Sequence, residues 1–242
     1  MKWSAGVAQI DPPRWVAVVL AAVAGFIDAC TFFGLFGLFV AQLTGSYVIA
    51  GTSFFSAGWP EATVLLAVPV FFAAGAAATV VAMIAAANGL PALACALLLE
   101  TVLLAGFTAM MVLGTPFPDP PGPVAFAAAL FGLSAMGVQS ALVRLLMRGV
   151  ASTNVMTTNT TQISIDAAQA ALTWGLRRGG DPEMARQHEA ACRRLAISVP
   201  LPVAFFAGTM TGALAYAAAG PWVLVLPTAA AAALTLWAVR AG

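Results

Sequence analysis

Residues 64–74 read Val-Leu-Leu-Ala-Val-Pro-Val-Phe-Phe-Ala-Ala, an apolar run without alternating polar positions. Residues 94–99 have the same character. The strands of an outer-membrane barrel would instead alternate apolar and polar side chains over segments of about ten residues. The two runs therefore indicate lipid-embedded α-helices.

Composition extends this conclusion to the whole chain. Of its 242 residues, 62% are apolar and 8% are charged, and the mean hydropathy is +0.96. Soluble domains are about 45–50% apolar and about 25% charged. Ten basic and nine acidic residues are too few to cover a water-facing surface, and a net charge of +1 attracts no polyanion. We predict an integral membrane protein and exclude a soluble enzyme, a nucleic-acid binder and a disordered chain.

Six windows have the length of about 20 mostly apolar residues that a transmembrane helix requires. They are residues 15–40, 62–87, 91–113, 124–143, 197–218 and 221–240. The first window contains Asp28 and three glycines, so we expect it to be tilted or broken. It is too long for the apolar region of a cleavable signal peptide. The predicted fold class is therefore an all-α integral membrane protein with six transmembrane helices.

The basic residues predict the orientation, because they concentrate in cytoplasmic loops. If the N-terminus is cytoplasmic, all ten lie on one side: Lys2, Arg14, Arg144, Arg148, Arg177, Arg178, Arg186, Arg193, Arg194 and Arg240. The opposite connections, about residues 41–61, 114–123 and 219–220, contain only Glu61 and Asp119 as charged residues. We predict cytoplasmic termini, with residues 1–14 as a cytoplasmic segment.

Three features recur in the same order along the chain. The motif of residues 25–28 (Gly-Phe-Ile-Asp) leads to Thr44-Gly-Ser46, and that of residues 137–140 (Gly-Val-Gln-Ser) leads to Thr157-Thr-Asn159. Further on, Pro69 precedes Gly75 as Pro202 precedes Gly208. We predict two repeats, residues 15–113 and 124–242. Each has three spans, so the second copy is inverted, as in secondary transporters whose substrate site lies at the repeat interface.

The second copy is longer by about twenty residues, at about 177–196. Asp181, Pro182 and Glu183 are typical of a helix N-terminus, and Glu189 and Arg193 are spaced for an ion pair. We predict a short cytosolic helix that leads into the fifth span.

Three other polar or reactive groups are given structural roles. His188 is interpreted as a solvated histidine, with a regulatory pH sensor as the alternative, and Asp166 as a solvated residue on an amphipathic stretch. The three cysteines are interpreted as packing residues, because they have no metal-type or disulfide spacing. They are Cys30, Cys95 and Cys192.

The paired motifs resemble those of the YoaK-like bacterial membrane proteins, a family defined as a domain of unknown function. In that family G-F-x-D-A leads to T-G-N, and G-x-Q-N-A leads to T-x-x-M-T-G-N. This chain departs from the pattern at Ser46, Ser140 and Thr158. The resemblance implies a six-span protein of the bacterial inner membrane, without an established substrate.

Ionisable residues within spans cost about 2.5–3.5 kcal/mol on insertion scales and are candidates for function. Asp28 and Glu100 are therefore candidates for proton coupling. The alternative for Asp28 is a structural hydrogen bond to a neighbouring helix, for example to Gln139, Ser140 or a threonine. The predicted substrate-binding residues are Asp28, Thr44, Gly45, Ser46, Gln139, Ser140, Thr157, Thr158 and Asn159. Capping of helices at the membrane surface is the alternative for the threonine-rich stretches.

These features favour a transporter of a small solute, with a passive channel as a variant. An intramembrane enzyme is disfavoured because the chain has no HEXXH, no GxSxG and no evident Cys–His pair. A membrane scaffold that binds partners through the Arg-rich insert is the main alternative. We expect a lipid bilayer as surroundings, no cofactor and no metal. Small residues four apart, Gly75 with Thr79 and Gly208 with Gly212, would permit a homodimer.

Overall fold

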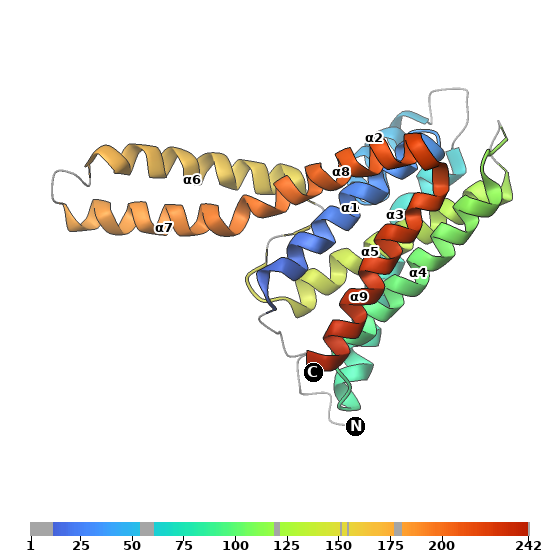
Figure 1. The fold of residues 1–242 in the computed structure, drawn as a ribbon, viewed down its shortest axis with the longest axis horizontal. Coiled ribbons are helices and arrows are strands. Elements are labelled where there is room, and N and C mark those ends of the chain that lie inside the picture. The colour runs from blue at the N-terminus through green and yellow to red at the C-terminus, as the bar shows by residue number, and fades with distance from the viewer. Residues whose placement is uncertain are drawn as a thin grey trace.

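The computed structural model describes residues 12–53, 61–118, 122–150, 152–153, 155–176 and 181–241. The helices in these ranges are α1 (Arg14–Gly34), α2 (Leu43–Ser53), α3 (Glu61–Ala87), α4 (Ala92–Gly114), α5 (Pro123–Leu146), α6 (Met156–Leu176), α7 (Pro182–Ser198), α8 (Pro200–Ala219), the 3-10 helix η2 (Gly220–Leu224) and α9 (Val225–Ala241). Six long helices, α1, α3, α4, α5, α8 and α9, form a bundle, and α6 and α7 form a hairpin that projects from it (Figure 1).

The bundle helices are long and apolar enough to cross a membrane. Among the described residues, five helical stretches meet this criterion: 14–34, 65–87, 92–114, 123–146 and the continuous stretch 182–241, which contains α8 and α9. Phe72 on α3 and Leu113 on α4 are each 77% exposed. Such side chains would be unfavourable in water and are suited to lipid. The protein is a multi-pass, all-helical membrane protein.

Each of the six predicted windows contains one bundle helix, but three details differ. The helix α1 is continuous as far as Gly34, so the first window, residues 15–40, is broken only near its end. The chain turns directly afterwards, where Phe36 and Gly37 have φ angles of 54° and 83°. The short helix α2 was not predicted. The last window contains both η2 and α9.

Contacts define the relative directions of the helices. Gly208 and Gly212 of α8 lie against Ala22 and Phe26 of α1, in the same order, so these helices run parallel. The helices α4 and α9 run antiparallel, because Thr101 contacts Thr235 (Oγ1–Oγ1 3.0 Å) and Thr108 contacts Thr228 (2.8 Å).

Two further pairs complete the arrangement. Gly137 of α5 packs against Phe71 of α3, and Ala141 lies near Gly75, so α3 and α5 are parallel. Gly106 and Gly114 of α4 lie against Phe131 and Val124 of α5, in reverse order, so these two helices are antiparallel. In all four pairs, the relative direction is the one expected if successive helices of the bundle alternate in direction.

The two ends of the bundle sequence lie together. The rings of Trp15, at the start of α1, and Trp237, near the end of α9, have centroids 5.2 Å apart. The beginning of the first bundle helix and the end of the last one are therefore on the same side of the bundle.

The hairpin helix α7 begins as the sequence predicts. The Glu183 backbone N–H donates to Asp181 Oδ1 at 2.8 Å, so Asp181 is the N-cap, and Pro182 is in the first turn. The predicted ion pair of Glu189 with Arg193 was wrong. Within the described residues, the ion pairs join Arg186 to Glu183 and Arg194 to Asp166.

Gly25 provides a test of the α1–α8 contact. A Cβ atom at this position would overlap the Phe205 carbonyl oxygen of α8 and lie 2.9 Å from Thr209 Oγ1. Because backbone cannot yield as a flexible side chain does, we expect Gly25→Ala to destabilise the protein by about 1–3 kcal/mol. The loss would be measured as a lower thermal midpoint of the detergent-solubilised protein. Gly175→Ala is the control, since nothing lies within 4 Å of a Cβ added there; equal midpoints for the two variants would contradict the packing.

Candidate functional site

Asp28 lies in the middle of α1 and holds the backbone of the segment that follows this helix. Its side chain is 2% exposed. Its Oδ1 accepts hydrogen bonds from the backbone N–H groups of Val40 (2.9 Å) and Ala41 (2.7 Å). Asp28 is six residues before the end of α1, which corresponds to about 9 Å along the helix. Residues 35–42 therefore fold back into the bundle, and we name them the first re-entrant segment.

The first re-entrant segment is buried by protein at the level of Asp28. Val40 is fully buried and Ala41 is 3% exposed. The Val40 side chain lies beside Gly132 of α5. Non-helical backbone at membrane depth is tolerated only where it is buried in protein or lines a cavity, and its N–H groups must find acceptors. Asp28 supplies the acceptor for two of them.

Gln139 of α5 has a similar relation to the segment after its own helix. Its Nε2 donates to Thr153 Oγ1 (3.1 Å) and to the Leu20 carbonyl of α1 (3.0 Å). Gln139 is seven residues before the end of α5, or about 10 Å along the helix. The described residues that follow α5, which are 147–150, 152–153 and 155, thus also return along the bundle. We name them the second re-entrant segment.

Each re-entrant segment leads into a helix whose first turn contains the predicted polar residues. Thr44, Gly45 and Ser46 begin α2, and Thr157, Thr158 and Asn159 begin α6. These stretches therefore form the first turns of two helices. Ser46 and Asn159 are buried, at 3% and 5% exposed, and Asn159 Nδ2 donates to the Ser152 carbonyl at 2.8 Å.

The predicted site residues form two groups rather than one. Asp28 does make structural hydrogen bonds, which was the alternative to a functional role, but its carboxylate accepts from Val40 and Ala41 of the following segment rather than from a neighbouring helix. Gln139 contacts α1 at Leu20, eight residues before Asp28 and about 12 Å along the helix. Ser140 is partly exposed and also takes part in an interaction. Sequence spacing could not reveal that each polar side chain serves its own re-entrant segment.

Glu100 is the second carboxyl group within the bundle. It is fully buried in α4, and neither of its oxygens has a hydrogen-bond partner among the described residues. The same holds for Asp28 Oδ2. Carboxyl oxygens at this depth are costly without partners, so both groups remain candidates for a functional role.

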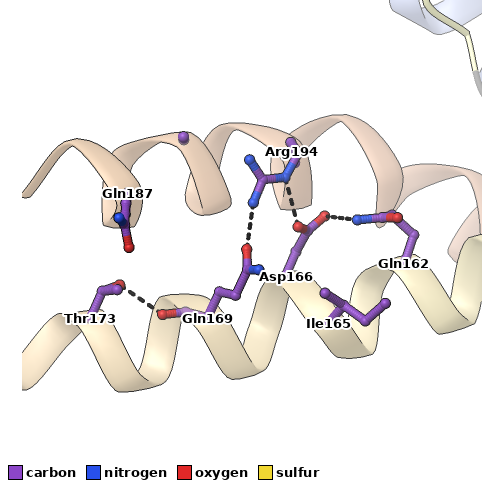
Figure 2. Close-up of a pocket in the computed structure, with 8 residues that line it drawn as sticks. Gln162, Ile165, Asp166, Gln169, Thr173, Gln187 and Arg194 are labelled. Atoms are coloured by element: carbon purple, nitrogen blue, oxygen red, sulfur yellow. Dashed lines mark hydrogen bonds and ion pairs between the residues drawn. The ribbon is translucent and has the colours of Figure 1, made fainter. Parts of the chain in front are cut away.

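The hairpin contains a polar network that the sequence did not indicate. Asp166 of α6 is buried, and the prediction that it is solvated was wrong. Arg194 of α7 donates from Nε to Asp166 Oδ1 and from a terminal nitrogen to Gln169 Oε1, both at 2.7 Å, and Gln162 Nε2 donates to Asp166 Oδ2 at 3.1 Å (Figure 2). A groove of about 470 Å³ adjoins this network; Thr173 and Gln187 are among its lining residues.

The environment of Asp166 has opposing effects on its pKa. Burial raises the pKa, but the hydrogen bonds from Arg194 and Gln162 and the positive charge of Arg194 lower it, and the net shift is downward. The contact therefore stabilises the hairpin above the ordinary aspartate pKa of about 3.9. This contribution is lost as the pH falls through the lower pKa of the folded state.

The prediction that His188 is solvated was also wrong. It is 8% exposed, not solvated. Its Nδ1 lies 3.0 Å from the Ala170 carbonyl oxygen and 3.2 Å from Thr173 Oγ1, and its Nε2 lies 3.5 Å from Cys192 Sγ. The statement that the chain has no Cys–His pair was therefore wrong. The Cys192–His188 pair could have been predicted from the sequence, because residues four apart lie side by side on a helix and this helix was predicted.

Metal ligation has no evident site in these arrangements. Among the residues that the structure describes, no three His, Cys, Asp or Glu side chains gather as metal ligands would.

These observations define a multi-pass helical membrane protein with two polar side chains that hold two re-entrant segments. Over residues 16–237 the chain matches the family described as "Protein of unknown function (DUF1275)", and it belongs to that family. This confirms the family resemblance drawn from the paired motifs. The comparisons with curated proteins and with solved structures gave no match.

We expect the Asp166–Arg194 contact to stabilise the hairpin. Arg194→Gln removes the charged donor from a buried carboxylate, and hydrogen bonds to charged groups contribute about 1.5–3 kcal/mol. We expect backbone hydrogen exchange in α6 and α7 to become about tenfold faster or more. Arg186→Gln is the matched control, because its pair with Glu183 is exposed and such pairs contribute about 0–1 kcal/mol. Equal exchange in the two variants would rule out a stabilising role for the Asp166 contact.

Proposed function

We propose that the protein is a secondary transporter of a small polar solute in the bacterial inner membrane, coupled to protons through Asp28. Its first repeat comprises α1 to α4, and its second comprises α5, α6, α8 and α9, with α7 as an insertion. Both termini are cytoplasmic in this proposal. It attributes transport, rather than catalysis, to the polar groups of the bundle.

The pair of re-entrant segments is the observation that carries the proposal. A shift of 112 residues places Gly25 on Gly137 and residues 40–41 on 152–153. In the first copy Asp28 binds the backbone of residues 40 and 41, and in the second Gln139 binds the side chain of Thr153. Matched first helices thus hold matched segments. Broken or irregular segments in corresponding positions of two halves are typical of transporter binding sites.

The packing of α4 on α9 supports an inverted relation of the repeats. A shift of 127 residues places Thr101 on Thr228 and Thr108 on Thr235. If each threonine is replaced by its equivalent under this shift, the Thr101–Thr235 contact becomes the Thr228–Thr108 contact. Two equivalent helices that contact each other in antiparallel directions in this way are related by a two-fold axis perpendicular to them. Such an axis in the membrane plane relates inverted repeats.

The other interfaces fit the same axis. The first helix of each repeat packs in parallel on the Pro-to-Gly helix of the other repeat: Gly25 of α1 on Phe205 of α8, and Gly137 of α5 on Phe71 of α3. The two glycines are equivalent under the shift of 112. This exchange of partners gives a repeat interface along the full length of the bundle.

Charge at the helix ends supports cytoplasmic termini. Arg14 begins α1 and Arg240 is in the last turn of α9, at the end of the bundle where Trp15 meets Trp237. Arg144 and Arg148 lie at the end of α5, which is antiparallel to α1. Four described arginines thus gather on one side, as expected of the cytoplasmic face.

Asp28 provides a link between a proton and the first re-entrant segment. An ionised carboxylate is a stronger acceptor for N–H groups than a protonated one. Protonation of Asp28 therefore weakens its hold on Val40 and Ala41 and favours release of the segment. Deprotonation fixes it again. Gln139 has no titratable group, so the second segment opens independently of pH. Glu100 is a second group that could carry a proton.

The test uses proteoliposomes that contain the dye pyranine, whose fluorescence reports lumenal pH. Amino acids, monosaccharides, nucleosides and small carboxylates are added outside in turn. We expect at least one class to move protons with the wild-type protein and not with Asp28→Asn, which retains an acceptor oxygen for Val40 and Ala41. Asp166→Asn, in the hairpin, serves as the control and should behave as the wild type. Identical traces for the wild type and Asp28→Asn with every class would contradict proton coupling at Asp28.

The projecting hairpin favours one alternative, a membrane scaffold that binds partners. It extends away from the bundle (Figure 1) and exposes Glu183, Arg186 and Arg193. A scaffold predicts that Asp28→Asn has no effect in cells, whereas charge reversal at Arg186 and Arg193 does. A transporter predicts that Asp28→Asn has an effect in cells and that charge reversal at Arg186 and Arg193 has none.

A further inference from the structure

Cys192 and His188 form a pair at the exposed surface of the hairpin. Both lie on α7, four residues apart, and Cys192 Sγ is 3.5 Å from His188 Nε2. Cys192 is exposed, whereas Cys30 is buried and Cys95 is partly buried. Cys192 is therefore the most accessible of the three thiols, and it has a base beside it.

The surroundings of His188 fix the orientation and the tautomer of its ring. The Ala170 carbonyl oxygen, 3.0 Å from Nδ1, can only accept a hydrogen bond. Nδ1 therefore carries a proton. In the neutral ring Nε2 then has its lone pair directed at the thiol. The Trp174 ring, with its centroid 5.4 Å from that of His188, packs beside the imidazole. Cys192, His188 and the Ala170 carbonyl are thus arranged as a nucleophile, a base and a group that orients the base.

We propose that Cys192 is a reactive thiol that undergoes exchange with small disulfides, with His188 as its general base. Nε2 of His188 takes the proton from Sγ, and the thiolate attacks one sulfur of the disulfide. The S–S bond of the reagent breaks, a bond between Cys192 and the attacked sulfur forms, and the departing thiolate takes the proton from the imidazolium. Cys192 is oxidised to a mixed disulfide, and one thiol is released for each disulfide consumed.

The modification would act on the contact between α6 and α7. His188 joins these helices through Ala170 and Thr173. A mixed disulfide at Cys192 has no S–H to donate to Nε2 and adds bulk beside the ring. The hairpin thereby acquires a site that responds to the thiol–disulfide balance of its compartment, independently of transport by the bundle.

The experiment measures the rate at which dithiodipyridine, an uncharged disulfide, reacts with the full-length protein in detergent. Cys30→Ala and Cys95→Ala leave Cys192 as the only thiol. Because a positioned general base contributes about 10²-fold or more, we expect His188→Gln to slow the reaction by at least about tenfold. In concentrated guanidinium chloride, which unfolds α7 and so separates His188 from Cys192, the two proteins should react at similar rates.

A relocated cysteine provides the matched control and protects the test against misfolding of His188→Gln. Ala196→Cys, combined with Cys192→Ser, places an exposed thiol one turn further along α7 and beyond reach of His188. We expect this thiol to react at least about tenfold more slowly than Cys192. Equal rates for the two positions, or a rate at Cys192 that does not change in a folded His188→Gln protein, would overturn the proposal.

Discussion

The two hydrogen bonds from Val40 and Ala41 to the Asp28 carboxylate are the constraint on which the architecture depends. A chain that leaves a transmembrane helix and returns into the bundle has N–H groups without helical partners. In a low-dielectric interior each such group costs about 1–3 kcal/mol if it stays unsatisfied. One buried oxygen satisfies two of them. The polar side chain in the middle of an otherwise apolar helix is thus required by the returning backbone, whatever else it does.

The same requirement explains why the two proposed repeats resemble each other more in geometry than in sequence. The first copy joins Asp28 to the backbone at residue 41, and the second joins Gln139 to the side chain of Thr153. The shift of 112 residues places Thr153 on residue 41 but Ser140, not Gln139, on Asp28. An amide provides a donor, so its partner is a side-chain hydroxyl and a carbonyl oxygen of α1 rather than two N–H groups. The structural role is similar, but only the first re-entrant segment is held by a titratable side chain. In the proposed transporter, protons would therefore act at the first re-entrant segment only.

Much of the fold could be predicted because lipid imposes simple rules. Long apolar windows gave six bundle helices, since a span must satisfy its own backbone groups. The helix start at Asp181 was also readable, because capping is local. The re-entrant segments were not, because their hydrogen bonds join Asp28 to residues twelve and thirteen positions away. The partner of Asp166 could not be predicted either, since Arg194 is 28 residues away and contacts Asp166 only when α6 packs on α7. His188 was misread because a polar residue in a charged helix looks solvated until its partner helix is known.

The central claim is that the two re-entrant segments enter the bundle from opposite faces, and sided thiol labelling tests it most directly. Thr44→Cys and Thr157→Cys place thiols at exposed positions in the first turns of α2 and α6, in a protein whose Cys30, Cys95 and Cys192 are replaced by alanine. A membrane-impermeant maleimide is applied to each face of oriented vesicles. The account predicts that Thr44→Cys is labelled only from the periplasmic face and Thr157→Cys only from the cytoplasmic face. Labelling of both from the same face would contradict it.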